Sequence, residues 1–443
     1  MGMGRNRLLV AGAIALFAGG TAAAGARSGT AVGAVVPAGV VSMEAPAPGG
    51  EAPRIRSARG EWSDLAVAVA AAGTGDTLRL AGGVHRSGTV VIDRPVTLLG
   101  EPGAVLENSG GAGLLHITAD GVTVRGLTLR GTPSSHVRDH AAVLVEGANG
   151  CVIEGNAFVD NFFGIYLARS SGCRLEGNTL TASGDRESSA GNGIHLWNAT
   201  DVIVTGNRVR GHRDGIYLEH VQGASLSRNV SEDNLRYGLH FMFSNGNEYI
   251  ANEFRRNNAG VAVMYSKEVV VRGNTFEDNW GAAAYGLLIK DIYDSVISGN
   301  TFRRNTVAIS SEGSTRVQVT GNRFVRNGWA VRVLASSQEN RFTANDFVEN
   351  SFDVTTNSRQ NYNTFDGNYW SRYNGYDLTG DGIGDVPHRP VRLFALLVQR
   401  SPAALVLLRS SFLDVLEVAE RVAPVLTPET LVDERPLMKE TAR

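Results

Sequence analysis

An excess of positive charge and long apolar runs are both missing from this chain. Its 443 residues carry 42 Lys+Arg against 44 Asp+Glu, for a formal net charge of −2. That balance gives no reason to expect non-specific nucleic-acid binding. Near the C-terminus, the apolar runs within 392–398 and 402–424 stop short of the roughly 17 residues that a membrane-spanning helix needs. We therefore expect this tail to pack on an apolar partner, peripheral to the membrane.

The N-terminus has the order of a secretory signal. Arg5 and Arg7 precede the apolar run 8–17, and small residues follow at 21–26. We expect residues 1–26 to be removed on export, the alternative being an uncleaved membrane anchor. Residues 27–60 are rich in Ala, Gly, Pro and Val without periodicity, and are expected to form a disordered linker.

A period near 22 residues runs through most of the chain. Asparagines preceded by Gly, Arg or Ala recur at intervals of 22 or 23 residues, with two longer intervals of 26 and 29. Helical repeats have longer periods, and the leucine consensus of leucine-rich repeats is absent. Three short strands per rung fit this length, so the sequence predicts an all-β fold, a right-handed parallel β-helix over residues 61–370. The asparagines are Asn156, Asn178, Asn207, Asn229, Asn252, Asn274, Asn300, Asn322, Asn345 and Asn368.

Residues one period apart are expected to lie above one another, about 4.8 Å apart. Asparagines then form a hydrogen-bonded ladder and aromatic rings stack in the core, while an alanine-rich helix at 63–72 caps the first rung. Cys151 and Cys173 are 22 residues apart and are expected to stack inside the core. Two buried thiols are favoured there over a strained disulfide.

Aligning the rungs on their short Gly-x-x-x strands gives a map of one outer face. His195 and His240 share a column, and the column two residues further on holds Glu219, Met242 and Met264. Only four methionines lie beyond the signal peptide, and two of them are vertical neighbours beside His240. An imidazole with two thioethers suits Cu(I), which soft sulfur ligands select.

The candidate metal ligands are thus His240, Met242, Met264, Glu219 and His195, with copper(I) as a transient cargo. The alternative, which we favour for the methionines and the nearby aromatics, is a docking surface. The two interpretations are compatible if metal passes across that interface. His212 and His220 lie in nearby turns and are expected to be solvated.

After Trp370 the repeat stops, and residues 371–443 are expected to comprise an Asp/Gly-rich turn and an amphipathic helical tail. Asp377, Asp381 and Asp385 take the first, fifth and ninth positions of an EF-hand-like loop, but His388 stands where the last acid belongs. Weak calcium binding and a plain turn therefore both remain open. Ser401 and Pro402 are placed to begin the amphipathic helix, which either caps the coil or docks on a partner.

The repeats that run into "GNYWSRYNGYDLTGDGIGDVPHRP" and then an apolar tail resemble the NosD family of periplasmic β-helix proteins. The resemblance covers about residues 60–440, and the junction motif is its specific part. It implies a non-catalytic role beside an ABC permease and its ATPase in copper-site assembly of nitrous oxide reductase, with a copper chaperone lipoprotein as a further partner. The resemblance does not assign any residue of this sequence as a copper ligand.

Two other classes of function remain as alternatives. Secreted β-helices include polysaccharide lyases and epimerases, and the loop "HVRDH" places His136, Arg138, Asp139 and His140 together. These could supply a base and a group that neutralises a uronate carboxylate. The mapped outer columns hold no adjacent acid pair, and Lys290 with Asp291 is the nearest other cluster, so no catalytic residue is assigned. A surface adhesin would give the tail no special role.

Overall fold

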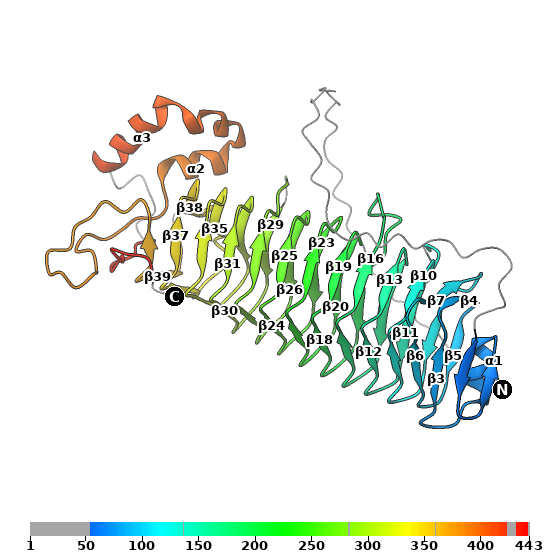
Figure 1. Ribbon diagram of the computed structural model, residues 1–443. Coiled ribbons are helices and arrows are strands. Elements are labelled where there is room, and N and C mark those ends of the chain that lie inside the picture. Colours follow the sequence, from blue (N-terminus) through cyan, green and yellow to red (C-terminus); the bar gives the residue numbers. More distant parts are fainter. Residues whose placement is uncertain (1–53, 136, 282–283, 359, 423–430, 442–443) are drawn as a thin grey trace, which may run out of the picture. The chain divides into compact units, whose positions relative to one another are not determined.

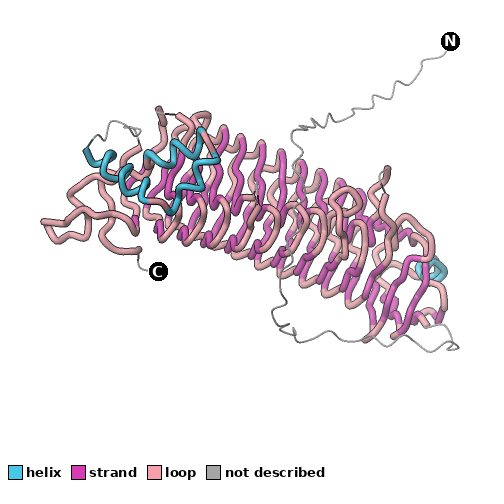
Figure 2. Tube along the Cα trace, turned by 90° about the horizontal axis from the view of Figure 1, so that it is seen from above, coloured by secondary structure: helices cyan, strands magenta, loops and turns pink. Residues whose placement is uncertain are grey.

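A computed structural model describes residues 54–135, 137–281, 284–358, 360–422 and 431–441. The chain winds as a right-handed coil of short strands, which confirms the predicted parallel β-helix. Figure 1 shows the strands stacked in sequence order along the coil, and Figure 2 shows the same rungs from above. The predicted signal peptide, most of the predicted linker and His136 lie outside the described residues.

Three sheets run along the coil, one strand per rung in each. The first sheet, in hydrogen-bonded order, contains β2 (Gly60–Trp62), β1 (Ile55–Ser57), β3 (Thr77–Leu80), β6 (Thr97–Gly100), β9 (Thr123–Arg125), β12 (Val152–Glu154), β15 (Arg174–Glu176), β18 (Ile203–Thr205), β21 (Ser225–Ser227), β24 (Glu248–Ile250), β27 (Val270–Arg272), β30 (Val296–Ser298), β33 (Gln318–Thr320), β36 (Arg341–Thr343) and β39 (Thr364–Asp366).

The second sheet contains β4 (Gly83–Ser87), β7 (Ala104–Asn108), β10 (Thr128–Arg130), β13 (Ala157–Val159), β16 (Thr179–Thr181), β19 (Arg208–Arg210), β22 (Val230–Glu232), β25 (Glu253–Arg255), β28 (Thr275–Glu277), β31 (Thr301–Arg303), β34 (Arg323–Val325), β37 (Asp346–Val348) and β40 (Tyr369–Trp370). The third sheet contains β5 (Val90–Ile92), β8 (Leu115–Ile117), β11 (Ala141–Glu146), β14 (Phe163–Ala168), β17 (Ile194–Trp197), β20 (Asp214–Glu219), β23 (Tyr237–Met242), β26 (Ala259–Met264), β29 (Tyr285–Lys290), β32 (Val307–Glu312), β35 (Trp329–Val333) and β38 (Phe352–Thr355).

The repeat period fixes the register of these sheets. Phe276 pairs with Phe302 and Phe302 with Phe324 in adjacent parallel strands. Their buried rings stack with centroids 4.5 and 5.1 Å apart, and the stack ends on Trp370. Apolar burial at the same position of every rung makes the core a continuous column.

The Gly-Asn dipeptides build the predicted ladder. Gly299 turns the chain with φ of 62°, in the left-handed region that a glycine adopts without steric cost. The next residue, Asn300, is buried and donates from Nδ2 to Asn322 Oδ1 at 2.9 Å. A second ladder lies five residues further along each rung and includes Asn257, Asn279 and Asn305. Every one of these buried amides therefore has hydrogen-bond partners on a neighbouring rung.

The first rung is covered at the N-terminal end of the coil. The antiparallel pair β1 and β2 is followed by α1 (Leu65–Ala71), whose N-cap Asp64 accepts a hydrogen bond from the Val67 N–H at 2.9 Å. This helix lies within the alanine-rich stretch that predicted a cap. Cys151 and Cys173 are both buried and are not bridged.

The tail differs from the single long helix expected after Pro402. It forms α2 (Leu393–Arg400), the 3-10 helix η1 (Pro402–Arg409) and α3 (Ser411–Val422). The break falls at Ser410, whose hydroxyl donates to the Leu407 carbonyl at 2.8 Å, a local bond that competes with helix continuation. Phe394 of α2 stacks on Phe352 of β38, so the helices pack beside the last rungs.

A returning segment, residues 431–441, covers the last ladder asparagine. Asp433 is fully buried and accepts hydrogen bonds from the Asn368 N–H, Asn368 Nδ2 and Trp370 Nε1 at 2.9 to 3.0 Å. The ladder is thus closed by a carboxylate, and the helices do not provide this contact.

Candidate functional site on the outer face of the third sheet

The predicted columns are present on the outer face of the third sheet. Tyr217 pairs with His195 on one side and with His240 on the other. Glu219 pairs with Met242, and Met242 with Met264. The structure therefore brings His240, Glu219 and the two methionines onto adjacent strands, while Tyr217 separates His195 from His240 by a full rung.

His240 is less accessible than an outward strand position suggests, since it is only 7% exposed. The rings of Tyr217 and Tyr237 pack against it with centroids 5.1 and 4.7 Å away. Its Nδ1 lies 3.6 Å from Asp214 Oδ2, within ion-pair reach, and its Nε2 finds no hydrogen-bond partner among the described residues. A carboxylate beside one ring nitrogen with the other left free is the arrangement seen around metal-binding histidines.

Asp214 is a fully buried carboxylate whose two side-chain partners are Arg236 and His240. Arg236 donates to it from Nε, at 2.8 Å to Oδ1, and from Nη2 to Oδ2. Burial opposes ionisation, but His240 and Arg236 together lower the pKa of Asp214 below its usual value. The carboxylate is therefore ionised at neutral pH and fixes the position of both partners.

His195 is a neutral imidazole in a ring stack. Burial, with a smaller contribution from Arg213, lowers the pKa of His195 to about 3. Its ring lies between Tyr166 and Tyr217, with centroids 4.5 and 4.7 Å away. Asn192 Nδ2 is 3.2 Å from its Nδ1. His195 is thus engaged on this face but two strands distant from Met242.

The methionines border an exposed ring stack that the sequence did not reveal. His220 stacks on Phe243 and Phe243 on Tyr265, with centroids 5.2 and 5.1 Å apart and nearly parallel planes. Phe243 is 43% exposed and Tyr265 42%. The three rings belong to the residues that directly follow Glu219, Met242 and Met264 in the chain. Each of these residues has φ near 50°. We call this set, His220, Phe243 and Tyr265 with Met242 and Met264, the outer aromatic patch.

His212 corrects the expectation of a solvated turn histidine. It is buried, at the place that an asparagine takes in the second ladder, and neither ring nitrogen has a hydrogen-bond partner among the described residues. Burial lowers the pKa of His212 to about 4. Its position five residues after ladder residue Asn207 was the signal available in the sequence.

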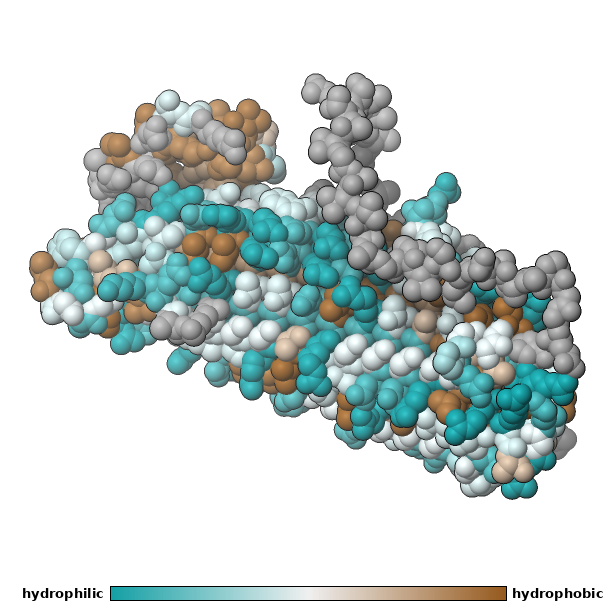
Figure 3. All heavy atoms as spheres, viewed as in Figure 1, coloured by the Kyte–Doolittle hydropathy of each residue, from teal (hydrophilic) through white to brown (hydrophobic). Residues whose placement is uncertain are grey.

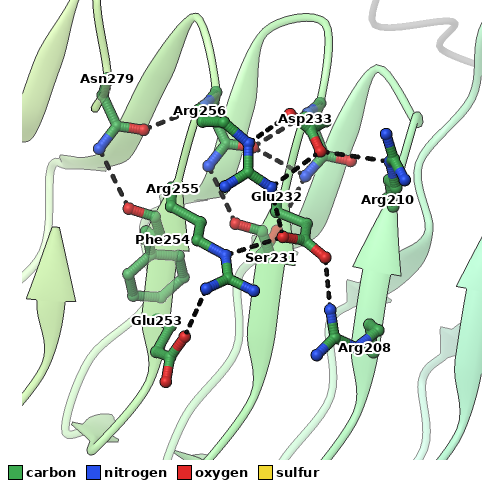
Figure 4. Close-up of polar contacts among 12 residues, drawn as sticks. Arg208, Arg210, Ser231, Glu232, Asp233, Glu253, Phe254, Arg255, Arg256 and Asn279 are labelled. Carbon is green, nitrogen blue, oxygen red and sulfur yellow. Dashed lines mark hydrogen bonds and ion pairs between the residues drawn. The ribbon is translucent and has the colours of Figure 1, made fainter. Parts of the chain in front are cut away.

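The second sheet carries an ion network that sequence reasoning also missed. Glu232 is buried and accepts from Arg255 at 2.8 Å and Arg256 at 2.7 Å, as well as from Arg208 (Figure 4). Burial alone would raise the pKa of Glu232, but the arginines, Arg255 foremost, lower it below its usual value. Acid pairs on this face are therefore neutralised by arginine and poorly suited to donate a proton.

The other candidate sites form no comparable cluster. Arg138 and Asp139 are exposed, and His140 Nδ1 contacts the Pro133 carbonyl at 3.0 Å.

The Asp377 carboxylate accepts hydrogen bonds from the N–H groups of Gly380 and Gly382 at 2.6 and 2.8 Å, so it closes a turn. Within the described ranges, no group of three or more His, Cys, Asp or Glu is arranged to hold a metal ion. Calcium binding by Asp377, Asp381 and Asp385 stays a prediction.

The sequence matches one broad structural class and one specific protein family. Residues 103–245 match the class described as a right-handed β-helix region. Residues 181–375 match the family described as "Periplasmic copper-binding protein (NosD)". The probable ABC transporter binding proteins NosD of Pseudomonas aeruginosa and Stutzerimonas stutzeri are 32% and 33% identical to this chain, over 80% and 82% of its length and 86% of each relative. The chain belongs to the NosD family.

Solved structures resemble this chain in fold. A Family 28 exopolygalacturonase from Yersinia enterocolitica matches with a TM-score of 0.55 and 13% identity, over 68% of this chain and 74% of the other. At this low sequence identity, the match shows that the two proteins share the β-helix fold and gives no information about function. Both NosD relatives are named as transporter binding proteins and not as enzymes. In the described part of the chain, no helix is long and apolar enough to cross a membrane.

Proposed function

We propose that this chain is a periplasmic accessory subunit of an ABC-type transporter and presents Cu(I) during copper-cluster assembly of nitrous oxide reductase. The family description and the transporter binding relatives support the general role. The copper assignment rests on Met242 and Met264, which pair in register, and on His240, which lies two residues before Met242 on β23 and whose Nε2 has no hydrogen-bond partner among the described residues. A permease and its ATPase, a copper chaperone lipoprotein and apo nitrous oxide reductase are the proposed partners.

The donor set fits a transiently held Cu(I). Thioethers are soft ligands that favour Cu(I) over harder divalent ions, and an imidazole is a third ligand that copper accepts. Asp214 orients the ring through Nδ1 and leaves Nε2 for the metal. The half-buried methionines border the exposed rings of the outer aromatic patch, so a docked chaperone would reach them directly.

Cu(I) competition titration tests this site. We expect the Met242→Ser, Met264→Ser double variant to lose more affinity than the roughly 10- to 100-fold typical of removing an outer partner of a metal ligand. Asp214→Asn should fall within that smaller range. Met438→Ser, a methionine in the segment at the C-terminal end of the coil, is the matched control and should bind as the wild type does. Equal affinity in the double variant and the control would remove copper from this face.

A further inference from the structure

Two long loops enclose a cleft at the edge between the second and third sheets. Residues 131–140 connect β10 to β11 and residues 182–193 connect β16 to β17, whereas the turn between them, 160–162, has only three residues. The cleft that these loops border has a volume of about 200 Å³. This is below the roughly 300–1,000 Å³ of a drug-sized site, so the cleft suits a single small ring.

The cleft is lined by groups that recognise hydroxyls. Asp160 accepts hydrogen bonds through Oδ1 from the Ser183 N–H at 3.0 Å and from the Ser183 hydroxyl at 2.7 Å, which fixes the carboxylate. The hydroxyls of Ser134 and Ser189 and the ring of Phe162 are also at its surface. Carboxylate and hydroxyl oxygens bind the hydroxyls of a sugar, and an aromatic ring packs on its apolar side.

A cation lies on the third-sheet side of the cleft. Arg213 donates from its backbone N–H to the carbonyl of the lining residue Gly191 at 2.8 Å. Its half-buried side chain donates from Nη2 to Asn192 Oδ1 at 3.2 Å, and its buried Nε has no hydrogen-bond partner among the described residues. A guanidinium held by a neutral amide keeps its charge for an anionic ligand.

Aromatic rings continue this surface along the third sheet. The half-buried rings of Tyr166 and His195 have centroids 4.5 Å apart, and Asn192 ties His195 to Arg213. Phe163, which follows the lining residue Phe162, contacts the Tyr166 and His195 rings at 5.9 and 5.3 Å. The cleft and the ring surface are therefore adjacent.

Asp139 is an acid within the electrostatic reach of Arg213. Arg213 lowers the pKa of Asp139, against the larger rise that burial causes, but the two side chains form no ion pair. Its exposed carboxylate can accept a ligand hydroxyl while Arg213 binds an anionic group. On the face drawn in Figure 3 the coil is largely hydrophilic, whereas hydrophobic residues gather over the tail helices, so the coil is the part suited to a water-soluble polymer.

We propose that this edge of the coil binds an acidic polysaccharide, with one sugar ring in the cleft against Asp160 and Phe162 and the carboxylate of a neighbouring sugar on Arg213. The formal net charge of −2 gives the chain no general attraction for polyanions, so binding requires such a local site. The site shares no residue with the proposed copper site and adds a second ligand class to the protein.

Fluorescence anisotropy with labelled oligogalacturonate and oligomannuronate tests the proposal on the copper-free chain. The wild type should bind at least one of the two and should not bind neutral dextran. Arg213→Gln should weaken binding roughly tenfold or more, as expected for the loss of a charge-assisted contact. Ser134→Trp, which fills the cleft and keeps Arg213, should also lose binding.

Arg272→Gln, at an exposed arginine of the first sheet, is the charge-matched control, and Ser188→Trp, at an exposed position of the loop 182–193, is the control for added bulk. Both should bind as the wild type does, and melting curves confirm that each variant folds. Unchanged affinity in Arg213→Gln, or dextran sulfate binding as tightly as the uronates, would overturn the proposal. Cu(I) affinity should not change in Arg213→Gln, which separates this site from the copper site.

Discussion

Asn274 illustrates what a single ladder residue contributes. Its Nδ2 donates to the Tyr249 carbonyl at 2.8 Å and to Asn300 Oδ1 at 3.0 Å, and its own N–H donates to that same oxygen at 2.8 Å. All of these groups are buried. Loss of the side chain would leave buried donors and acceptors unpaired, which costs more than the bonds themselves contribute.

Asn274→Ala should therefore lower the free energy of unfolding by roughly 3 kcal/mol. Asn258→Ala, an exposed asparagine one rung earlier, should stay within about 0.5 kcal/mol of the wild type. Urea unfolding followed by circular dichroism measures both. Similar midpoints for the two variants would contradict the structural role given to the ladder.

The ionisation of Asp353 makes the stability of the fold depend on pH. Burial raises its pKa to about 6, although Arg372 and Arg392 oppose the shift. A carboxyl whose pKa is raised on folding stabilises the fold while protonated. That contribution is complete below the unfolded-state pKa near 4 and disappears as the pH rises through about 6.

Relative to the wild type, Asp353→Asn should gain roughly 2 kcal/mol of stability between pH 4 and pH 7.5. Urea midpoints at the two pH values give this difference. Asp185→Asn, an exposed acid in the loop after β16, should follow the wild type at both. A constant difference between Asp353→Asn and the wild type would show that Asp353 does not titrate in this range.

At the scale of elements, the repeating parts were predictable, whereas several parts that occur only once were not. A fixed period sets the register, so the pairing of Met242 with Met264 and the Asn ladder followed from spacing alone. The burial of His240 depends on Tyr237 and on rings from other rungs, which spacing does not describe. The helix break at Ser410 and the hydrogen bond from Asn368 to Asp433 each occur once, so the repeat pattern could not predict them.

The tail helices give a prediction of their own. Val406→Glu with Val415→Glu places charge on the exposed apolar side and leaves Asp433 and the ladder untouched. We expect this variant to lose co-purification with the permease, because the charged side chains would be desolvated at an apolar contact.

The double variant Val67→Glu, Val91→Glu alters two exposed valines near the N-terminal end and should co-purify as the wild type does. Permease binding that survives the tail substitutions would place the docking surface elsewhere. Deletion of residues 391–443 would be less informative, because it also removes the carboxylate that closes the ladder.

At the scale of the molecule, one coil carries both the proposed copper site on its third sheet and the tail helices proposed to dock on the permease. Residues 214 to 264 contribute Asp214, His240, Met242 and Met264 from three successive rungs, held in register by the core stack and the ladder. Sheets with every inner position buried deform little, so the spacing of these side chains is fixed before any ligand binds.

X-ray absorption at the copper edge tests the central claim most directly. The wild-type chain loaded with one equivalent of Cu(I) should show sulfur scatterers together with a nitrogen donor, and Met242→Ser with Met264→Ser should remove the sulfur signal. A first shell of nitrogen and oxygen alone in the wild type, unchanged by the two substitutions, would contradict the account.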